Sequence, residues 1–186
     1  SHAVIFLVPE QFTFQSERDL IKALSTGGTL GTTVLSFRRL AYALFNDAGG
    51  ITAPHLHSAG KCMIIYGILE KLKRELKIFS RSAERQGFVN SISELLTEFK
   101  RYKLTPDLLA DTCLQMEEDG PLRLKLKELS LIYSEYEKVL EDRYRDSDDD
   151  LTLAAVKLRE STIFNRAEIW IDGFSGFTPQ EYELIK

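Results

Sequence analysis

The feature that most constrains this chain is a run of five apolar residues, Val4 to Val8, which Pro9 stops at once. A short, uninterrupted apolar run is typical of a central parallel strand, because both faces of such a strand are buried. A helical pattern follows in "FQSERDLIKAL", with Ser16 as a candidate cap and the Gly27-Gly28 pair as its end. A second strand, "TTVLSF", and a second helix, "RRLAYALF", come next. The order strand, helix, strand, helix predicts an α/β fold.

The pattern changes after residue 58, and up to residue 160 we find no convincing strand. Apolar residues in this region recur in steps of three and four, which is the spacing of one face of a helix. The longest series follows Gly120-Pro121 and forms a packing seam: Leu122, Leu126, Leu129, Tyr133, Tyr136 and Leu140. The acidic run "RDSDDD" interrupts the helices, and a buried strand is expected again only at "AEIWIDGF".

We therefore predict an α/β core interrupted by a large all-helical insertion. The predicted boundaries are residues 1–55 for the first part of the core, 56–162 for the insertion and 163–186 for the return to the core. The chain starts at a strand without Met and stops within a helical pattern, so we expect a piece of a larger protein. Ser1-His2 is interpreted as a remnant of cloning.

Charge and hydropathy exclude some classes of protein. The 186 residues include 24 basic and 28 acidic ones, for a net charge of -4, which argues against a free-standing basic clamp for nucleic acid but permits local DNA contacts. No apolar run is long enough for a membrane span, and no secretory leader is recognised. Only two cysteines, Cys62 and Cys113, occur, which fits a reducing cytoplasm. We expect a cytoplasmic protein without membrane contact.

Asp172 is the first candidate site residue, because it directly follows the apolar residues of the last predicted strand. A carboxylate at the end of a parallel strand can hold Mg²⁺ beside a nucleotide phosphate. The alternative is an Asp that ends the strand and caps the next turn. A hydrolytic site usually also has a Glu nearby, and here the next residue is Gly173. Both interpretations stay open at this point.

A phosphate-binding loop is not found in this sequence. The nearest match to G-x-x-x-x-G-K-[ST] is Gly60-Lys61, where Cys62 replaces the hydroxyl residue and His55 replaces the first glycine. We therefore expect no cofactor in this chain alone. His55 and His57 lie near Cys62, but no fourth ligand is close in sequence, so no metal site is predicted. No catalytic residue is assigned.

Two kinds of segment are candidates for DNA contact. The first are the loops after the first two predicted strands, "PEQFTF" and "LSFRR", which offer the side chains of Gln11, Thr13, Ser36, Phe37 and Arg38. The alternative is that these side chains only stabilise the turns that follow the two strands.

The second kind is basic. In "FKRYK" the residues Lys100, Arg101 and Lys103 alternate with aromatic residues, as in single-strand binding sites. The alternative for "FKRYK" is the solvated face of a helix. For the other basic stretch, "EKLKRELK", a solvated helix face is the favoured interpretation.

Four segments together resemble one family: "VIFLVPEQFTFQSER", "TTVLSFRRLAYALF", "LLTEFKRYKLTP" and "IWIDGFSGFTPQEYELI". They are similar to the N-terminal region of the B subunit of bacterial AddAB-type helicase–nucleases, also called RexB. The resemblance implies a partial P-loop NTPase (RecA-like) helicase core with a helical insertion. It also implies a heterodimer with the A subunit, a role in double-strand DNA break processing and recombinational repair, and association of the B subunit with a recombination hotspot sequence.

The same resemblance implies roles for individual segments. "PEQFTF" and "LSFRRLA" would be DNA-contacting motifs, and Asp172 would be a remnant of the magnesium site. The P-loop would precede Val4, so ATP and Mg²⁺ would belong to the parent protein, an ATP-dependent deoxyribonuclease and helicase component. The Asp172-Gly173 pair departs from the Asp-Glu pair of an active motor, so we predict a region that grips or reads single-stranded DNA rather than unwinding it.

Two other functions stay open. One is a helical protein–protein interaction domain on a small α/β base, in which the seam from Leu122 to Leu140 and the acidic run contact a partner. The other is an active NTPase whose phosphate loop lies outside this chain.

Overall fold

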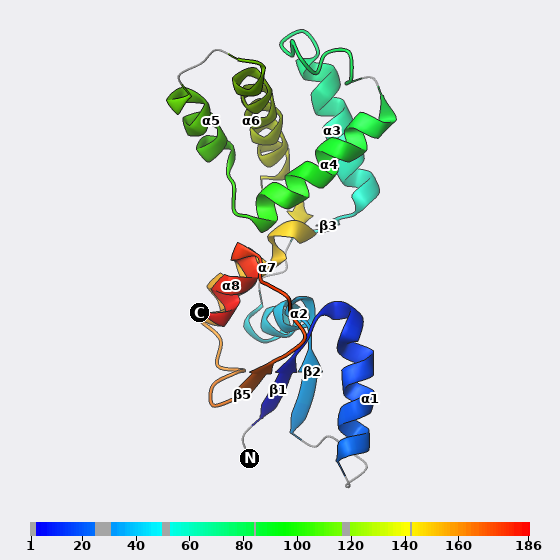
Figure 1. Cartoon of the computed structure of the whole chain (residues 1–186), viewed down its shortest axis with the longest axis vertical. Coiled ribbons are helices and arrows are strands. Elements are labelled where there is room, and N and C mark those ends of the chain that lie inside the picture. The colour runs from blue at the N-terminus through cyan, green and yellow to red at the C-terminus, as the bar shows by residue number, and fades with distance from the viewer. Residues whose placement is uncertain (1–2, 25–30, 50–52, 84, 117–119, 142) are drawn as a thin grey trace. The chain divides into compact units, whose positions relative to one another are not determined.

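The computed structural model describes residues 3–24, 31–49, 53–83, 85–116, 120–141 and 143–186. It divides into two compact units (Figure 1). The strand unit comprises Ser1–Ile51 and Asp150–Lys186, and the helical unit comprises Thr52–Asp149. Ser1-His2 and the Gly27-Gly28 pair, at which a helix end was predicted, lie outside the described residues.

The strand unit is an α/β structure with a parallel sheet, as the sequence predicts. Its described elements are β1 (Val4–Leu7), a 3-10 turn η1 (Glu10–Phe12), α1 (Thr13–Ala23), β2 (Thr32–Leu35), α2 (Phe37–Ala48), α7 (Asp150–Leu158), β5 (Glu168–Ile171) and α8 (Pro179–Ile185). The strand order is β2-β1-β5, with Ile5 opposite Thr33 on one side and Ile169 on the other. The strand β1 is therefore central, which explains its continuous apolar sequence.

Two local predictions for this unit are wrong. Ser16 lies inside α1 and does not cap it, because the helix already begins at Thr13. The strand β5 was expected to be buried, yet Ile169, Trp170 and Ile171 are 46%, 55% and 40% exposed. The reason is topological: among the described residues β5 pairs only with β1, so it is an edge strand.

The core of the strand unit forms where α2 packs beside β1, α7 and α8. Apolar residues of α2 recur at helical spacing, and all are buried: Phe37, Leu40, Ala41, Leu44 and Phe45. Ser36 caps this helix by accepting a hydrogen bond from the Arg39 N–H at 3.2 Å. At α8 the Thr178 and Glu181 side chains form a capping box, so the Thr178-Pro179 sequence starts a helix.

The helical unit consists mainly of four helices. Its described elements are β3 (His55–Leu56), α3 (Ser58–Leu72), α4 (Gln86–Arg101), α5 (Pro106–Gln115), α6 (Pro121–Leu140), β4 (Arg145–Asp146) and a 3-10 turn η2 (Ser147–Asp149). The helix α3 ends at Leu72, so Leu76 reaches the core from a turn rather than from the helix. The short parallel pair of β3 and β4 was not predicted, because its partners lie about ninety residues apart.

Candidate nucleic-acid interface

The carboxyl ends of β1, β2 and β5 lie at one edge of the sheet, because the three strands are parallel. Backbone hydrogen bonds join these ends: the Val8 N–H donates to the Leu35 carbonyl at 2.9 Å, and the Asp172 N–H donates to the Leu7 carbonyl at 3.0 Å. The loops that follow the strands therefore start from a fixed common edge. We call this region, from Pro9 to Gln11 with Ser36 to Arg38 and Asp172, the sheet edge.

The loop after β1 presents Gln11 but not Thr13. The side chain of Gln11 is in η1 and is exposed to solvent. Thr13 is buried, and its hydroxyl donates to the Glu10 carbonyl oxygen at 3.0 Å. Thr13 thus stabilises the turn that starts α1, whereas the Gln11 side chain is accessible to solvent.

In the loop after β2, the first two candidate residues for DNA contact, Ser36 and Phe37, have structural roles. Ser36 is buried, caps α2 and donates its hydroxyl hydrogen to the Glu10 carboxylate. The ring of Phe37 is buried against Phe174 and Phe177, with ring centroids 5.4 Å and 6.0 Å away in edge-on packing. The structure also shows that Glu10 belongs to the sheet edge, which the sequence analysis did not predict. Its position directly after Pro9, at the end of the apolar run, could have indicated this.

Arg38 is the exposed cation of the sheet edge. Its guanidinium lies 5.8 Å from the centre of the Tyr42 ring, one turn further along α2. A hydrogen bond to the Tyr42 side chain, with smaller contributions from the carboxylates of Glu10 and Asp150, holds the pKa of Arg38 above its ordinary value. The arginine is therefore held in place and charged at any physiological pH.

Asp172 stands at the end of β5 with an exposed side chain. Its carboxylate oxygen Oδ1 accepts a hydrogen bond from the Gly173 N–H at 2.8 Å. Gly173 has φ of +77°, a left-handed conformation that residues with a side chain adopt at a cost. The backbone at this turn therefore favours glycine directly after Asp172.

Of the three basic residues predicted in "FKRYK", Lys100 lies in the interior of the helical unit, whereas Arg101 and Lys103 do not. Its ammonium group is 3.4 Å from the Asp146 carboxylate and 2.9 Å from that of Glu137, and it also bonds to Asp149. Burial alone would lower the pKa of Lys100, but these three carboxylates together raise it above its ordinary value. With its side chain only 2% exposed, Lys100 is not available to a DNA phosphate in this structure.

Arg101 and Lys103 lie on the surface at the end of α4. The guanidinium of Arg101 is 3.6 Å from the Glu98 carboxylate. Lys103 has φ of +57° and terminates the helix, where its N–H donates to the Lys100 carbonyl at 3.0 Å. Of the predicted basic group, these two can meet a ligand, and they are in the other unit from the sheet edge.

A buried polar cluster explains the acidic run "RDSDDD", for which the sequence analysis offered a helix break or a contact with a partner protein. The Tyr136 hydroxyl donates to Asp146 at 2.8 Å, and Lys61 donates to Asp148 at 2.6 Å. The ammonium groups of Lys61 and Lys100 each lie 5.6 Å from the centre of the Tyr136 ring. The Lys of the nearest P-loop match is thus part of the core of the helical unit.

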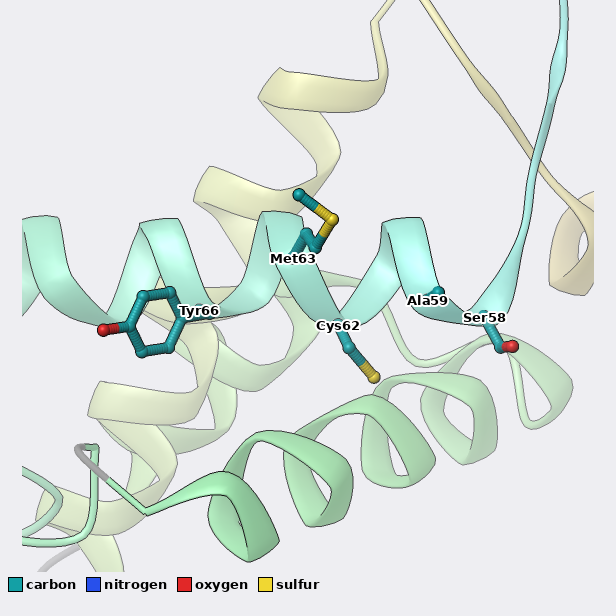
Figure 2. Close-up of a pocket in the computed structure, with 5 residues that line it drawn as sticks. All are labelled: Ser58, Ala59, Cys62, Met63 and Tyr66. Atoms are coloured by element: carbon teal, nitrogen blue, oxygen red, sulfur yellow. The ribbon is translucent and has the colours of Figure 1, made fainter.

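An open pocket lies along one side of α3, lined by Ser58, Ala59, Cys62, Met63 and Tyr66 (Figure 2). The Cys62 side chain points toward α4 and donates weakly to the Asn90 side chain at 3.7 Å, whereas Met63 points away from α4. Met63 and Tyr66 are 75% and 50% exposed. Across the described ranges, no three His, Cys, Asp or Glu side chains are grouped as metal ligands. No described helix combines the length and apolar character that crossing a membrane requires.

The fold and the sheet edge define a class: α/β proteins whose candidate ligand loops follow the ends of parallel strands. Within that class, the chain belongs to the ADDB N-terminal family, whose model, described as "ADDB, N-terminal", matches residues 1–186.

Three relatives are each described as the B subunit of an ATP-dependent helicase/deoxyribonuclease. The protein from Acetivibrio thermocellus is 60% identical over 185 residues, and that from Ruminiclostridium cellulolyticum is 55% identical over 182 residues. The protein from Clostridium botulinum (strain Loch Maree) is 48% identical over 183 residues. These alignments cover 100%, 98% and 98% of this chain but 16% of each relative, so the chain spans about one sixth of their length.

Proposed function

We propose that this chain is the N-terminal part of the B subunit of a helicase–nuclease and that its sheet edge contacts single-stranded DNA without driving unwinding. The parent protein would act with an A subunit in processing double-strand DNA breaks. The observation that carries the proposal is the placement of Gln11 and Arg38 at the ends of neighbouring parallel strands. Both are exposed, and the loops that carry them are tied together by Ser36 and Glu10.

The chemistry of these two side chains suits a nucleic-acid backbone. An arginine can bind a phosphate through two parallel N–H groups, and an amide side chain can donate to phosphate or base. Phe12 and Phe14, in the turn and helix that follow Gln11, are 46% and 73% exposed and could stack on bases. Together these groups support single-strand binding more directly than they support catalysis.

Asp172 enters the proposal as the remnant of a magnesium–nucleotide site in a RecA-like P-loop core. ATP and Mg²⁺ would bind with residues of the parent protein outside this chain. The turn at Gly173 supports a site without a catalytic base, because its backbone favours glycine. We expect Asp172→Ala in the complete complex to leave unwinding by the partner motor largely unchanged, and a collapse of unwinding would contradict this role.

The test of the sheet edge is a double variant, Gln11→Ala with Arg38→Ala, in the complete protein. We expect its affinity for a short single strand to fall by roughly tenfold at low salt, since a phosphate contact is lost. The matched control is Gln15→Ala with Arg18→Ala, an exposed pair of the same residue types that bond to each other on α1. Equal affinities of the two double variants would overturn the proposed site.

The second candidate function is an interaction domain, and the exposed apolar face at Met63 and Tyr66 favours it. It predicts that Met63→Ser with Tyr66→Ser weakens assembly with the A subunit while DNA affinity is unchanged. Sedimentation of the mixed proteins would measure that assembly.

A further inference from the structure

Residues 73–83 of the helical unit, here called the basic segment, form a compact series of turns between α3 and α4. They include four basic residues and one acidic residue in a chain whose net charge is -4. Backbone hydrogen bonds close the turns, among them Ser82 N–H to the Phe79 carbonyl at 3.0 Å and Leu76 N–H to the Leu72 carbonyl at 3.0 Å. Figure 1 shows the segment at the end of α3 that is far from β3.

A buried carboxylate on α6 holds the basic segment in place. Glu128 is only 4% exposed, and its two oxygens accept three consecutive backbone N–H groups, from Lys77 at 2.7 Å, Ile78 at 3.0 Å and Phe79 at 3.0 Å. Leu76 and Ala83 are buried in the core of the unit, which anchors the segment at both ends. Glu128 thus holds the backbone of the segment, while the side chains of Arg74, Lys77 and Arg81 are exposed to solvent.

Three cations of the basic segment, Arg74, Lys77 and Arg81, differ from four lysines elsewhere in the helical unit. Lys61, Lys71, Lys100 and Lys138 each lie within 3 Å of a carboxylate oxygen. Arg74, Lys77 and Arg81 are exposed, and within the described ranges none of them forms an ion pair. Lys125, three residues before Glu128 on α6, is another exposed cation.

We propose that the basic segment is a second DNA-binding surface, which contacts backbone phosphates independently of sequence. It rests on the proposed function, in that the complete protein must act on DNA. Protein partners are usually held by buried aromatic or apolar anchors, and none of the exposed large apolar residues lies in this segment. Phosphate binding requires charge and N–H donors alone, which is what the segment presents.

The test is a triple variant of the complete protein, Arg74→Gln with Lys77→Gln and Arg81→Gln. Dissociation constants for a duplex and for a single strand are measured over a range of salt concentrations. We expect the slope of log affinity against log salt to fall by roughly 2 to 3, at about 0.9 per lost phosphate contact on duplex and 0.7 on a single strand. Whichever probe shows the larger affinity loss is the form that the segment binds.

A matched control removes the same charge elsewhere: Lys71→Gln with Lys138→Gln and Lys157→Gln, all of which are paired with carboxylates. For this control variant, the slope of log affinity against log salt is expected to stay close to that of the unsubstituted protein. An unchanged slope in the Arg74, Lys77 and Arg81 variant overturns the inference. So does loss of assembly with the A subunit at unchanged DNA affinity, since the segment would then bind a protein.

The Gln11 and Arg38 variant separates this inference from the proposed function. If DNA binding depends on the sheet edge alone, only the inference fails. If it depends on the basic segment alone, the inference stands and the proposed sheet-edge site fails. A parent protein that binds no DNA at low salt overturns both.

Discussion

At the scale of single residues, the turn after β5 shows how backbone conformation decides which side chain a site can carry. Gly173 has φ of +77°, and a Cβ atom there would lie 3.4 Å from the Pro9 ring. The steric contact is ordinary, so the cost of a side chain comes from the left-handed backbone. The residue that can follow Asp172 is thus limited by the backbone conformation of the turn.

A glutamate at this position is expected to strain the fold without creating an ATPase. Gly173→Glu should lower the free energy of unfolding by about 1 to 2 kcal/mol, because a residue with a side chain must adopt the left-handed conformation. Gly176→Glu is the control: its φ is not positive and its Cβ would meet open space. Urea unfolding of both variants measures the difference, and equal stabilities would contradict the strain argument.

At the scale of elements, an ion-pair network joins α3 to α6. Glu135 on α6 accepts hydrogen bonds from Lys71 on α3 at 2.6 Å and from Lys138 on its own helix at 2.9 Å. These two bonds lower the pKa of Glu135 to about 2. The network is at the surface, so we assign it a small share of stability.

The pH dependence of this network has a definite sign. Because the pKa of Glu135 is depressed in the folded protein, the network stabilises the fold above the unfolded pKa of about 4.3 and is lost as pH falls toward 2. We expect Lys71→Ala to raise the pKa of Glu135 toward the ordinary value, as followed by NMR titration of its side chain. A pKa that does not move would show that Lys138 or the helix alone sets it.

At the scale of the whole molecule, the chain builds two separate cores. The strand unit packs around Leu7, Leu40 and Leu44, whereas the helical unit packs around Ile65, Leu69 and Leu96. The helical unit also contains the buried cluster of Lys61, Lys100, Tyr136 and Asp146. Removing one member of a buried ionic cluster leaves its partners unpaired, which destabilises strongly.

Lys100→Met is therefore expected to destabilise the helical unit selectively, by about 3 to 5 kcal/mol. Hydrogen exchange should show faster exchange in α3, α4 and α6, with little change in β1 and α2. Lys138→Met, which removes an exposed cation from α6, is the control and should have a small effect. Equal loss of protection in both units would show that they unfold together.

The sequence by itself determined the class of fold, because hydrophobic periodicity reports local structure. It located β1 as a central strand, a helix at α2 and a mainly helical region after residue 58. It also placed Gln11, Arg38 and Asp172 at strand ends, since parallel strands share an edge. Tertiary structure alone decided that β5 is exposed, that β3 pairs with β4, and that Lys100 points inward while Arg101 points outward. These outcomes depend on contacts between residues distant in sequence, such as Lys100 with Asp146 and Glu128 with Lys77, and local periodicity carries no information about those partners.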